Sequence, residues 1–248
     1  MIAPTQVANP LAFMHERFVA DKLNGLFCIP GLEVVLPSVE IVGTPLDRES
    51  IMRHLELAIR TAYKSGDKIG PESHTKILKH ILSLKHESTL EHFQMTFLVR
   101  TNRGVSHEAV RHRIGHSFTQ ESTRYVGYDK HPPQVILPWH LVERPDADKV
   151  FWSEEIPVPI LRSYLSALER GWKPQDARGF LPNDLKTEFT WSMNVRSARA
   201  MLNLRTPGSA HPDMQVVARE LLRLWYETVP VLFQDIWDRT EKLVGVDA

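Results

Sequence analysis

Residues 111–125 read RHRIGHSFTQESTRY, and this stretch decides most of what the sequence predicts. Three consecutive side chains, Arg111, His112 and Arg113, are cationic or can become so, and a hydroxyl-rich run leads from them to Arg124. Neighbouring side chains on a helix diverge by about 100°, so the three fan out and can grip one polyanionic ligand from several sides. Guanidinium groups match phosphate oxygens bidentately, and imidazole adds a donor whose charge changes near neutral pH. For the triplet alone, an exposed basic turn is the alternative interpretation.

The composition argues for local rather than global anion recognition. The chain has 248 residues, enough for one large domain or two small ones with a substantial core. It carries 30 Lys+Arg and 30 Asp+Glu residues, so its formal net charge is zero. Nucleic-acid and membrane-surface binders normally carry an excess of basic charge, so neither class is expected. No segment approaches the ~18 uninterrupted apolar residues of a membrane span.

Cysteine usage and the first residues indicate the compartment. The single cysteine, Cys28, argues against an intramolecular disulfide framework and a multi-cysteine zinc site. The first residues do not resemble a secretory leader, because His15, Glu16 and Arg17 interrupt the apolar run. Both observations favour a reducing, cytoplasmic setting.

The predicted fold class is α+β, with more helix than strand and no internal repeat. Residues 1–32 are expected to form an N-terminal arm, with a short helix over 11–23, and residues 33–248 a single catalytic domain. Alternation of apolar residues and β-branched content predict strands over 33–42 (at a sheet edge or bent at Pro37), 93–99 and 187–193, and a strand or extended loop over 117–128. A surface connection is expected over 129–148. Helices are expected from Asp47, from Pro71-Glu72-Ser73, over 103–113, from Val150 to Gly171, from Pro174, and over 194–205, 212–228 and 230–244.

Arginines recur where loops and helix ends are expected to converge. They are Arg111, Arg113, Arg124, Arg178, Arg196, Arg199 and Arg205. Each alone is interpreted as a solvated surface charge. Arg178 is the exception because its neighbours are apolar, and Arg196 or Arg205 should lie at a buried edge, where arginine is rarely unpaired. Together with the zero net charge, this favours a small phosphate-bearing ligand over a polymer.

Two nearby histidines could indicate a metal site, but the spacing between them does not support one. His86 and His92 enclose Glu87 and Glu91, but their separation does not match the i, i+4 pairing of a His-Glu-x-x-His zinc helix. No metal site is therefore expected. Hydrogen bonding in a turn and ligand contact by Ser88 and Glu91 are the remaining interpretations.

Ser122 has three possible roles. It could be a nucleophile with His112 or His116 as base, a hydrogen-bond donor to a ligand, or a structural hydroxyl. The sequence has no Gly-x-Ser-x-Gly elbow, which favours the donor role over the nucleophile. It also has no Gly-x-Gly-x-x-Gly and no Gly-rich lysine loop, so a Rossmann or Walker nucleotide site is not expected.

Six motifs appear in a specific order. They are HESTLEH at 86–92, RGVSHE at 103–108, RHR at 111–113, QESTRY at 120–125, ARGFLP at 177–182, and NVR through NLR at 194–205. Together they resemble the flavin-dependent thymidylate synthases, over roughly residues 33–244. The resemblance implies an α+β fold with an antiparallel or mixed sheet, and a homotetramer whose active sites are shared between subunits. It also implies FAD reduced by NADPH, methylenetetrahydrofolate as carbon donor, and conversion of dUMP to dTMP.

The resemblance also implies residue roles. Flavin-side positions are His86, Ser88, Glu91, Arg111, His112, Arg113, Gln120, Asn194, Arg196 and His211. Positions around dUMP are Glu108, Arg111, Gln120, Glu121, Ser122, Thr123, Arg124, Arg178 and Arg205. The expected catalytic residues are Arg205 and Ser122, and Arg205 matches an arginine near the pyrimidine that favours ionisation at N3. Because the flavin carries the hydride and one-carbon steps, the protein mainly needs to position groups and supply charge.

The sequence departs from the family pattern at four places. Eight residues, Ile114 to Glu121, separate the triplet from Ser122 where the family has seven, so a bulge is expected near Gly115. Glu108 stands where glutamine is common, and Ala200 where asparagine is frequent. The segment 206–215 is longer than usual, which leaves His211 and Asp213 as alternatives for one flavin-side group. These departures motivate a second hypothesis, a nucleotide-binding relative without turnover. A third, an RNA-binding module, is disfavoured by the zero net charge.

Overall fold

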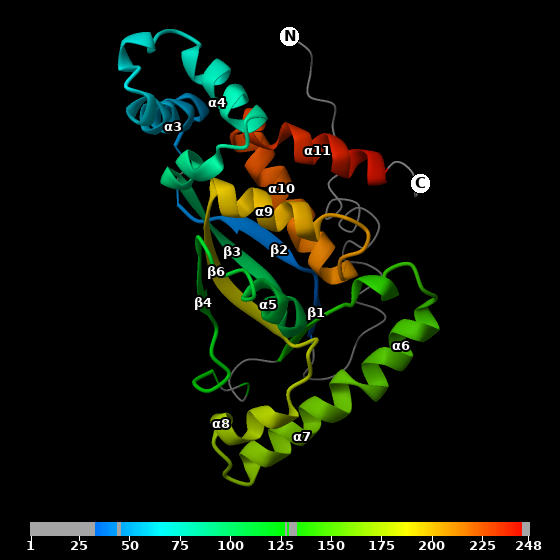
Figure 1. The fold of residues 1–248 in the computed structure, drawn as a ribbon. Helices are drawn as coiled ribbons and strands as arrows, with labels where there is room; N and C mark the ends of the chain where they lie inside the picture. Colours follow the sequence, from blue (N-terminus) through cyan, green and yellow to red (C-terminus); the bar gives the residue numbers. More distant parts are fainter. Residues whose placement is uncertain (1–32, 44–45, 127, 129–132, 245–248) are drawn as a thin grey trace. The chain divides into compact units, whose positions relative to one another are not determined.

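The computed structural model describes residues 33–43, 46–126, 128 and 133–244. Figure 1 shows the path of the chain through these segments, a mixture of helices and strands that confirms the α+β class. The predicted N-terminal arm, its short helix and Cys28 lie outside the described residues. None of the helices in the described segments combines the length and hydropathy that a bilayer crossing requires.

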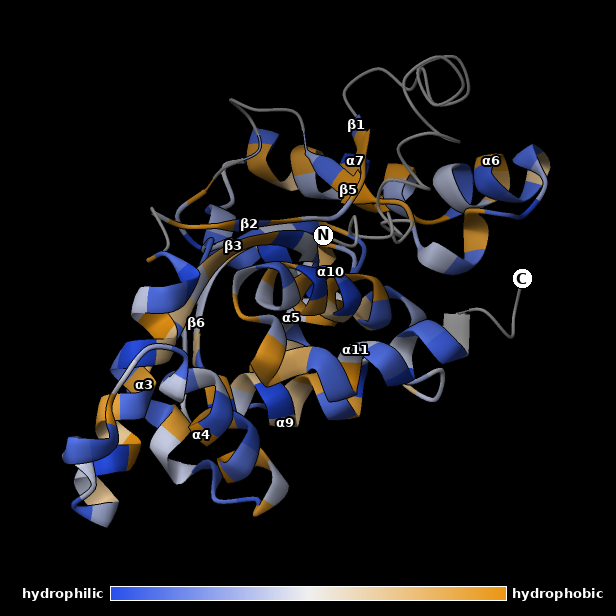
Figure 2. Ribbon diagram, turned by 90° about the horizontal axis from the view of Figure 1, so that it is seen from above, coloured by the Kyte–Doolittle hydropathy of each residue, from blue (hydrophilic) through white to orange (hydrophobic). Residues whose placement is uncertain are grey.

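The strand predicted over 33–42 is two strands in two sheets. Strand β1 (Glu33–Val35) ends before Pro37, and β2 (Ser38–Ile41) begins after it. Proline cannot donate to a sheet ladder, so the chain breaks at Pro37 instead of bending through it. Strand β1 pairs in parallel with β5 (Gln134–Ile136), and Figure 2 shows hydrophobic colouring on both. The prediction of a mere surface connection over 129–148 was therefore wrong for β5, whose Val135 and Ile136 are buried.

The second sheet has four strands in the order β2-β3-β6-β4. Its longer members are β3 (Gln94–Asn102), β6 (Lys186–Asn194) and β4 (His116–Gln120). At one end of β3, Arg103 N donates to Leu185 O, and at the other Val195 N donates to Phe93 O. The residue numbers rise on one strand as they fall on the other, so β3 and β6 are antiparallel. Strand β4 is also antiparallel to β6, because Asn194 N donates to Gly115 O and Glu121 N donates to Glu188 O.

The helices follow the sequence pattern closely in the C-terminal part of the chain. Their bounds are α3 (Arg48–Tyr63), α4 (Ser73–Ser83), α5 (Arg103–Ala109), α6 (Asp146–Glu155), α7 (Pro157–Glu169), α8 (Pro174–Ala177), α9 (Val195–Arg205), α10 (Pro212–Thr228) and α11 (Pro230–Val244). The short 3-10 helices are η1 (Gly66–Lys68), η2 (Glu87–His92), η3 (Trp139–Leu141) and η4 (Arg178–Phe180). Asp47 caps α3 as predicted, accepting from Ser50 N at 3.0 Å.

Two helix predictions need correction. The helix expected over 103–113 ends at Ala109, so the Arg-His-Arg triplet lies in the turn that follows it. The helical region expected from Val150 begins at Asp146 and is divided at Pro157, because proline starts a helix readily but cannot continue one.

The described chain divides into two compact units. Unit 1 holds residues 33–38, 99–111 and 119–189, and unit 2 holds residues 39–98, 112–118 and 190–244. In unit 1 the buried cluster includes Trp152 and Tyr164. In unit 2 the rings of Phe97, Trp225 and Phe233 form a buried row, with centroid separations of 5.8 and 5.0 Å. The assignment of residues 33–248 to one catalytic domain stays a prediction.

Candidate active site

Both long strands end at an asparagine that starts the next helix. Asn102 Oδ1 accepts from Val105 N at 2.8 Å at the start of α5, and Asn194 Oδ1 accepts from Ser197 N at 2.9 Å at the start of α9. These are N-caps, which satisfy donors that the first helical turn leaves unpaired. The resemblance placed Asn194 beside the flavin, but the structural use of its side chain was missed. Asparagine directly before a helical pattern was the available signal.

Gln120 is anchored within unit 1. Its Nε2 donates to Ser106 Oγ at 2.9 Å and to Thr187 Oγ1 at 3.0 Å. A carboxamide nitrogen has two N–H groups, so both are used by the protein. Only Oε1 of Gln120 can therefore serve a ligand in this arrangement.

Glu121 faces protein groups of the same unit. Its Oε1 accepts from the Tyr128 hydroxyl at 3.3 Å, and its Oε2 lies 3.9 Å from Lys186 Nζ. Burial and the negative charge of Glu121 raise the pKa of Tyr128 far above its usual value, so the phenol stays protonated and remains a donor. These contacts give Glu121 an internal role in addition to the one that the resemblance implies.

The Ser122–Tyr125 turn carries the exposed Arg124. Tyr125 N donates to Ser122 O at 3.1 Å, and Arg124 N donates to Ser122 Oγ at 3.3 Å. Arg124 Nε donates to Gln175 Oε1 of α8 at 3.2 Å, three residues before Arg178. Within unit 1, this contact holds the turn against the segment that ends at Arg178. Arg178 itself is exposed, although its sequence neighbours are mostly apolar.

The remaining predicted residues of unit 1 lie at the end of α5 and in the turn after β4. Glu108 is partly buried in the last turn of α5, and Arg111 is exposed just beyond it, with its backbone N–H donating to Glu108 O at 3.2 Å. Thr123 is buried, with 6% of its surface exposed. The triplet is divided between the units after Arg111.

In unit 2, η2 presents the first group of predicted flavin-side residues. His86 and Ser88 are exposed, and His86 Nδ1 lies 3.1 Å from the Tyr63 hydroxyl. Glu91 pairs with Arg196 of α9 at 2.6 Å, so the structure brings these two predicted residues together. In the part of the chain that is described, no group of three or more His, Cys, Asp or Glu residues is arranged to hold a metal ion.

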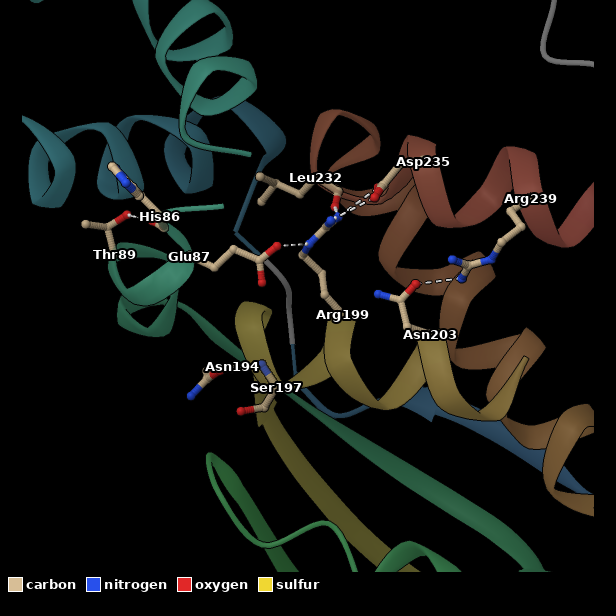
Figure 3. A network of polar contacts seen from close by, with 10 residues as sticks. All are labelled: His86, Glu87, Thr89, Asn194, Ser197, Arg199, Asn203, Leu232, Asp235 and Arg239. Atoms are coloured by element: carbon tan, nitrogen blue, oxygen red, sulfur yellow. Dashed lines mark hydrogen bonds and ion pairs between the residues drawn. The ribbon is translucent and has the colours of Figure 1, made fainter. Parts of the chain in front are cut away.

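The Arg199 side chain is hydrogen-bonded to residues of both η2 and α11 (Figure 3). Its Nε donates to Glu87 Oε1 at 3.2 Å, and Nη1 and Nη2 donate to the two carboxylate oxygens of Asp235, each at 2.8 Å. Nη1 also donates to Leu232 O. Burial alone would lower the pKa of Arg199, but the two carboxylates outweigh it and raise the pKa.

The interpretation of Arg199 as a solvated charge was therefore wrong. The residue is 6% exposed. Its alanine and methionine neighbours were the signal that could have placed it inside.

Arg205, at the end of α9, has a different kind of partner. Its Nε donates to His112 Nε2 at 3.2 Å. The His112 ring lies 5.6 Å from that of His116, and His116 Nδ1 accepts from the buried Trp191 Nε1 at 2.9 Å. Of the two candidates for a buried edge, Arg205 is the partly buried one and Arg196 is exposed.

Both imidazoles already use their accepting nitrogen. A neutral imidazole has one such nitrogen, and His112 offers it to Arg205 while His116 offers it to Trp191. Neither ring has a lone pair left for a general base toward Ser122. This geometry favours the hydrogen-bonding role of Ser122 over the nucleophilic one.

The comparison with known sequences decides the family. A profile of the family described as thymidylate synthase complementing protein matches residues 48–231. The chain belongs to this family.

Named relatives are similar over most of their length. The flavin-dependent thymidylate synthase of Geobacter sulfurreducens is 32% identical over 186 residues, which cover 72% of this chain and 79% of that protein. That of Corynebacterium aurimucosum is 33% identical over 197 residues, covering 73% and 78%. That of Thermosipho melanesiensis is 30% identical over 192 residues, covering 71% and 82%.

Gly115, near which the sequence predicts a bulge, has a special backbone conformation. Gly115 has φ +71°, in the left-handed region, and a Cβ at this position would collide with the side chains of Ser197 and Asn194. Ser197 Oγ donates to Ile114 O at 2.7 Å, and Asn194 N donates to Gly115 O at 3.2 Å. The turn at Ile114 and Gly115 is thus hydrogen-bonded to the start of α9, and only glycine fits at position 115 without strain.

The choice between His211 and Asp213 stays open. His211 is exposed immediately before α10, whereas Asp213 is buried in its first turn. A carboxylate in a first turn interacts favourably with the helix dipole, which gives Asp213 a structural reason to be there.

Proposed function

We propose that this chain is a flavin-dependent thymidylate synthase that converts dUMP to dTMP. In this proposal FAD is the cofactor, NADPH the reductant and methylenetetrahydrofolate the carbon donor. The observation that carries the proposal is the extent of the family match. Residues 48–231 include every position that the motifs assign to the site, from His86 to Asp213.

The chemistry of the residues in unit 2 fits a flavin nucleotide. Arg113 is exposed and has no side-chain hydrogen bond or ion pair with any described residue, and Arg196, His86 and Ser88 add exposed donors. Guanidinium, imidazole and hydroxyl groups suit a diphosphate. These residues would hold FAD, which supplies hydride and one-carbon chemistry when bound.

The residues of unit 1 fit a nucleoside monophosphate. Arg111, Arg124 and Arg178 are exposed cations, and Ser122 presents a hydroxyl beside Arg124. Arg103 Nη1 is buried and makes no hydrogen bond within the described residues. A buried donor without a partner costs free energy, so an anion that accepts from it would be stabilised. We assign the phosphate of dUMP to this set of cations.

Arg205 would act on the pyrimidine. A guanidinium stays protonated at any relevant pH, and a fixed positive charge in a site that excludes water stabilises negative charge that develops at N3 of the uracil. His112 holds this guanidinium through one N–H group. The chain therefore contributes position and charge, which agrees with the limited case for Ser122 as a nucleophile.

The proposal includes a homotetramer with active sites shared between subunits, and a cytoplasmic location. Light scattering of the purified protein measures the assembly, and a mass of four chains is expected. Mixing two inactive variants, one altered in Arg178 and one in Arg196, tests sharing: partial recovery of turnover is expected if different subunits complete one site.

The function is tested on purified protein supplied with FAD. A yellow protein with an absorption band near ~450 nm, a general property of oxidised flavin, is expected. NADPH oxidation that depends on dUMP, and dTMP detected by chromatography, complete the expected result. A protein that gains no colour with FAD contradicts the proposal. Tight dUMP binding without dTMP, at saturating folate and NADPH, would favour the nucleotide-binding relative without turnover.

A further inference from the structure

A row of ring contacts in unit 2 leads from a buried tryptophan to Arg205. Trp191 is fully buried, and its Nε1–H donates to His116 Nδ1 at 2.9 Å. The rings of His116 and His112 are 5.6 Å apart, and His112 Nε2 accepts from Arg205 Nε at 3.2 Å. Trp191 also lies 6.5 Å from the His112 ring, so both imidazoles pack on the same indole.

The direction of these hydrogen bonds fixes the protonation of both histidines. Arginine and tryptophan only donate, so Nε2 of His112 and Nδ1 of His116 must each carry a lone pair. His112 is therefore neutral with its proton on Nδ1, and His116 is neutral with its proton on Nε2. The ionisable groups that face His112 are Arg205 on α9 and His116 on β4. Arg205 disfavours a positive charge on His112, and His112 disfavours one on His116.

The environment supports the neutral state. Burial, reinforced by the positive charge of Arg205, lowers the pKa of His112 below its usual 6.5. Burial and the neighbouring His112 lower the pKa of His116 to about 4. At neutral pH both rings are thus available as acceptors.

We propose that His112 is a positioning residue for Arg205, holding the guanidinium by its Nε–H without neutralising it through that contact. This positioning role rests on the proposed function, in which Arg205 acts on the pyrimidine. The resemblance placed His112 on the flavin side, yet its accepting nitrogen is used by Arg205. A carboxylate in the same place would hold Arg205 as firmly but would cancel part of the charge that the reaction uses.

The turn at Ile114 and Gly115 helps to place the row. The backbone at Ile114 and Gly115 is hydrogen-bonded to the start of α9, and His116 follows directly. The same residues therefore fix His116 against His112 and His112 against Arg205.

The proposal has a definite pH dependence. Protonated His112 has no lone pair at Nε2 and carries the same charge as Arg205, so the contact is lost when His112 binds a proton. Because the pKa of His112 is lowered from its usual 6.5, kcat should reach its full value at neutral pH and should fall only at a pH below 6.5. The acid limb belongs to kcat, since substrate-bound enzyme must keep Arg205 in place.

Two variants separate positioning from flavin contact. His112→Leu removes the acceptor, and kcat should fall about 10–100-fold while the flavin content and the KM for dUMP change less than about threefold. His112→Gln keeps an oxygen near the place of Nε2 and does not titrate, so it should recover most of kcat and lose the acid limb attributed to His112. Loss of flavin in both variants, or unchanged kcat in His112→Leu, would overturn the proposal.

A measurement without turnover separates this inference from the proposed function. Nitrogen NMR of the imidazoles in the wild-type holoprotein should show the Nδ1–H tautomer of His112 with a pKa below 6.5, and Arg205→Met should raise that pKa. An Nε2–H tautomer, or a pKa that does not respond to Arg205→Met, contradicts the positioning role even if dTMP is formed. The expected NMR result with no dTMP formed would refute the proposed function alone.

Discussion

Two arginines on α9, six positions apart, are held by opposite kinds of partner. Arg199 is buried and hydrogen-bonded to the carboxylates of Glu87 and Asp235, whereas Arg205 donates to the neutral ring of His112. The first arrangement joins three segments of unit 2 and balances the charge of the guanidinium. The second joins a guanidinium to a neutral acceptor, and this contact adds no negative charge. In the proposed function, Arg199 stabilises the fold and Arg205 contacts the pyrimidine.

The largest effect is expected at Arg205. Arg205→Ala should lower turnover about 10²–10³-fold, because in the proposed function it removes the positive charge that would stabilise the ionised pyrimidine. Flavin absorbance and the melting temperature should stay close to wild type. Steady-state dTMP formation, measured beside the bound-flavin spectrum, checks this. Equal loss of flavin and activity would show that Arg205 serves the cofactor instead.

Arg199 should show the reverse pattern. Arg199→Met leaves Glu87 and Asp235 without their shared cation and should cost about 2–3 kcal/mol of unfolding free energy. Turnover per bound flavin should change little at a temperature where the variant is folded. Urea unfolding measures the free energy.

Arg53→Met is the matched control for Arg199. It breaks an exposed ion pair with Glu49 on α3, and should cost less than about 0.5 kcal/mol. If both variants lose the same stability, the buried pairs of Arg199 do not stabilise the fold as inferred.

Gly115 tests the turn that supports the imidazole row. Gly115→Ala places a Cβ against Ser197 and Asn194 at a positive φ, and should cost about 1–2 kcal/mol. Gly171→Ala is the control, because Gly171 has φ +85° but no atom within 4 Å of the added Cβ. Thermal unfolding compares the two. A larger loss in the control would show that the contacts around Gly115 do not matter.

The smallest effect is expected at the helix caps. Asn194→Ala and Asn102→Ala each remove one N-cap bond and should cost about 1 kcal/mol. If Asn194 also contacts the flavin, Asn194→Ala alone should lower FAD affinity. Titration of both variants with FAD shows whether Asn194 only caps the helix or also binds the flavin. Equal FAD affinity of the two variants would show that Asn194 does not contact the cofactor.

The sequence predicted the parts of the fold that depend on local pattern. Helices α9, α10 and α11 and strand β6 have strong periodicity and clear proline or asparagine boundaries, and their predicted bounds agree with the structure to within a residue or two. The predicted bounds were wrong at Pro37 and Pro157. At these positions proline divides a strand and a helix, although the apolar pattern of the sequence continues across it. Strand β5 was missed because its three residues are too short for a period to be read.

The site could be predicted as a set of residues but not as a set of contacts. The ordered motifs predicted the family, which the comparison confirmed. The partner of each arginine depends on residues distant in the chain: Glu87 and Asp235 lie 112 and 36 positions from Arg199, and His112 lies 93 from Arg205. Such pairing is decided by tertiary packing. The sequence alone therefore gave Arg199 the wrong role, a solvated charge, and did not predict the contact of His112 with Arg205.

The acidity of bound dUMP tests most directly whether Arg205 acts through its charge. Uracil labelled with ¹⁵N at N3 can be titrated by NMR in the holoprotein and in its Arg205→Ala variant, at saturating dUMP and without folate. The pKa of N3 should be lower in the wild-type complex than in the variant. Equal N3 pKa values in both complexes would contradict the assignment of Arg205 to the pyrimidine.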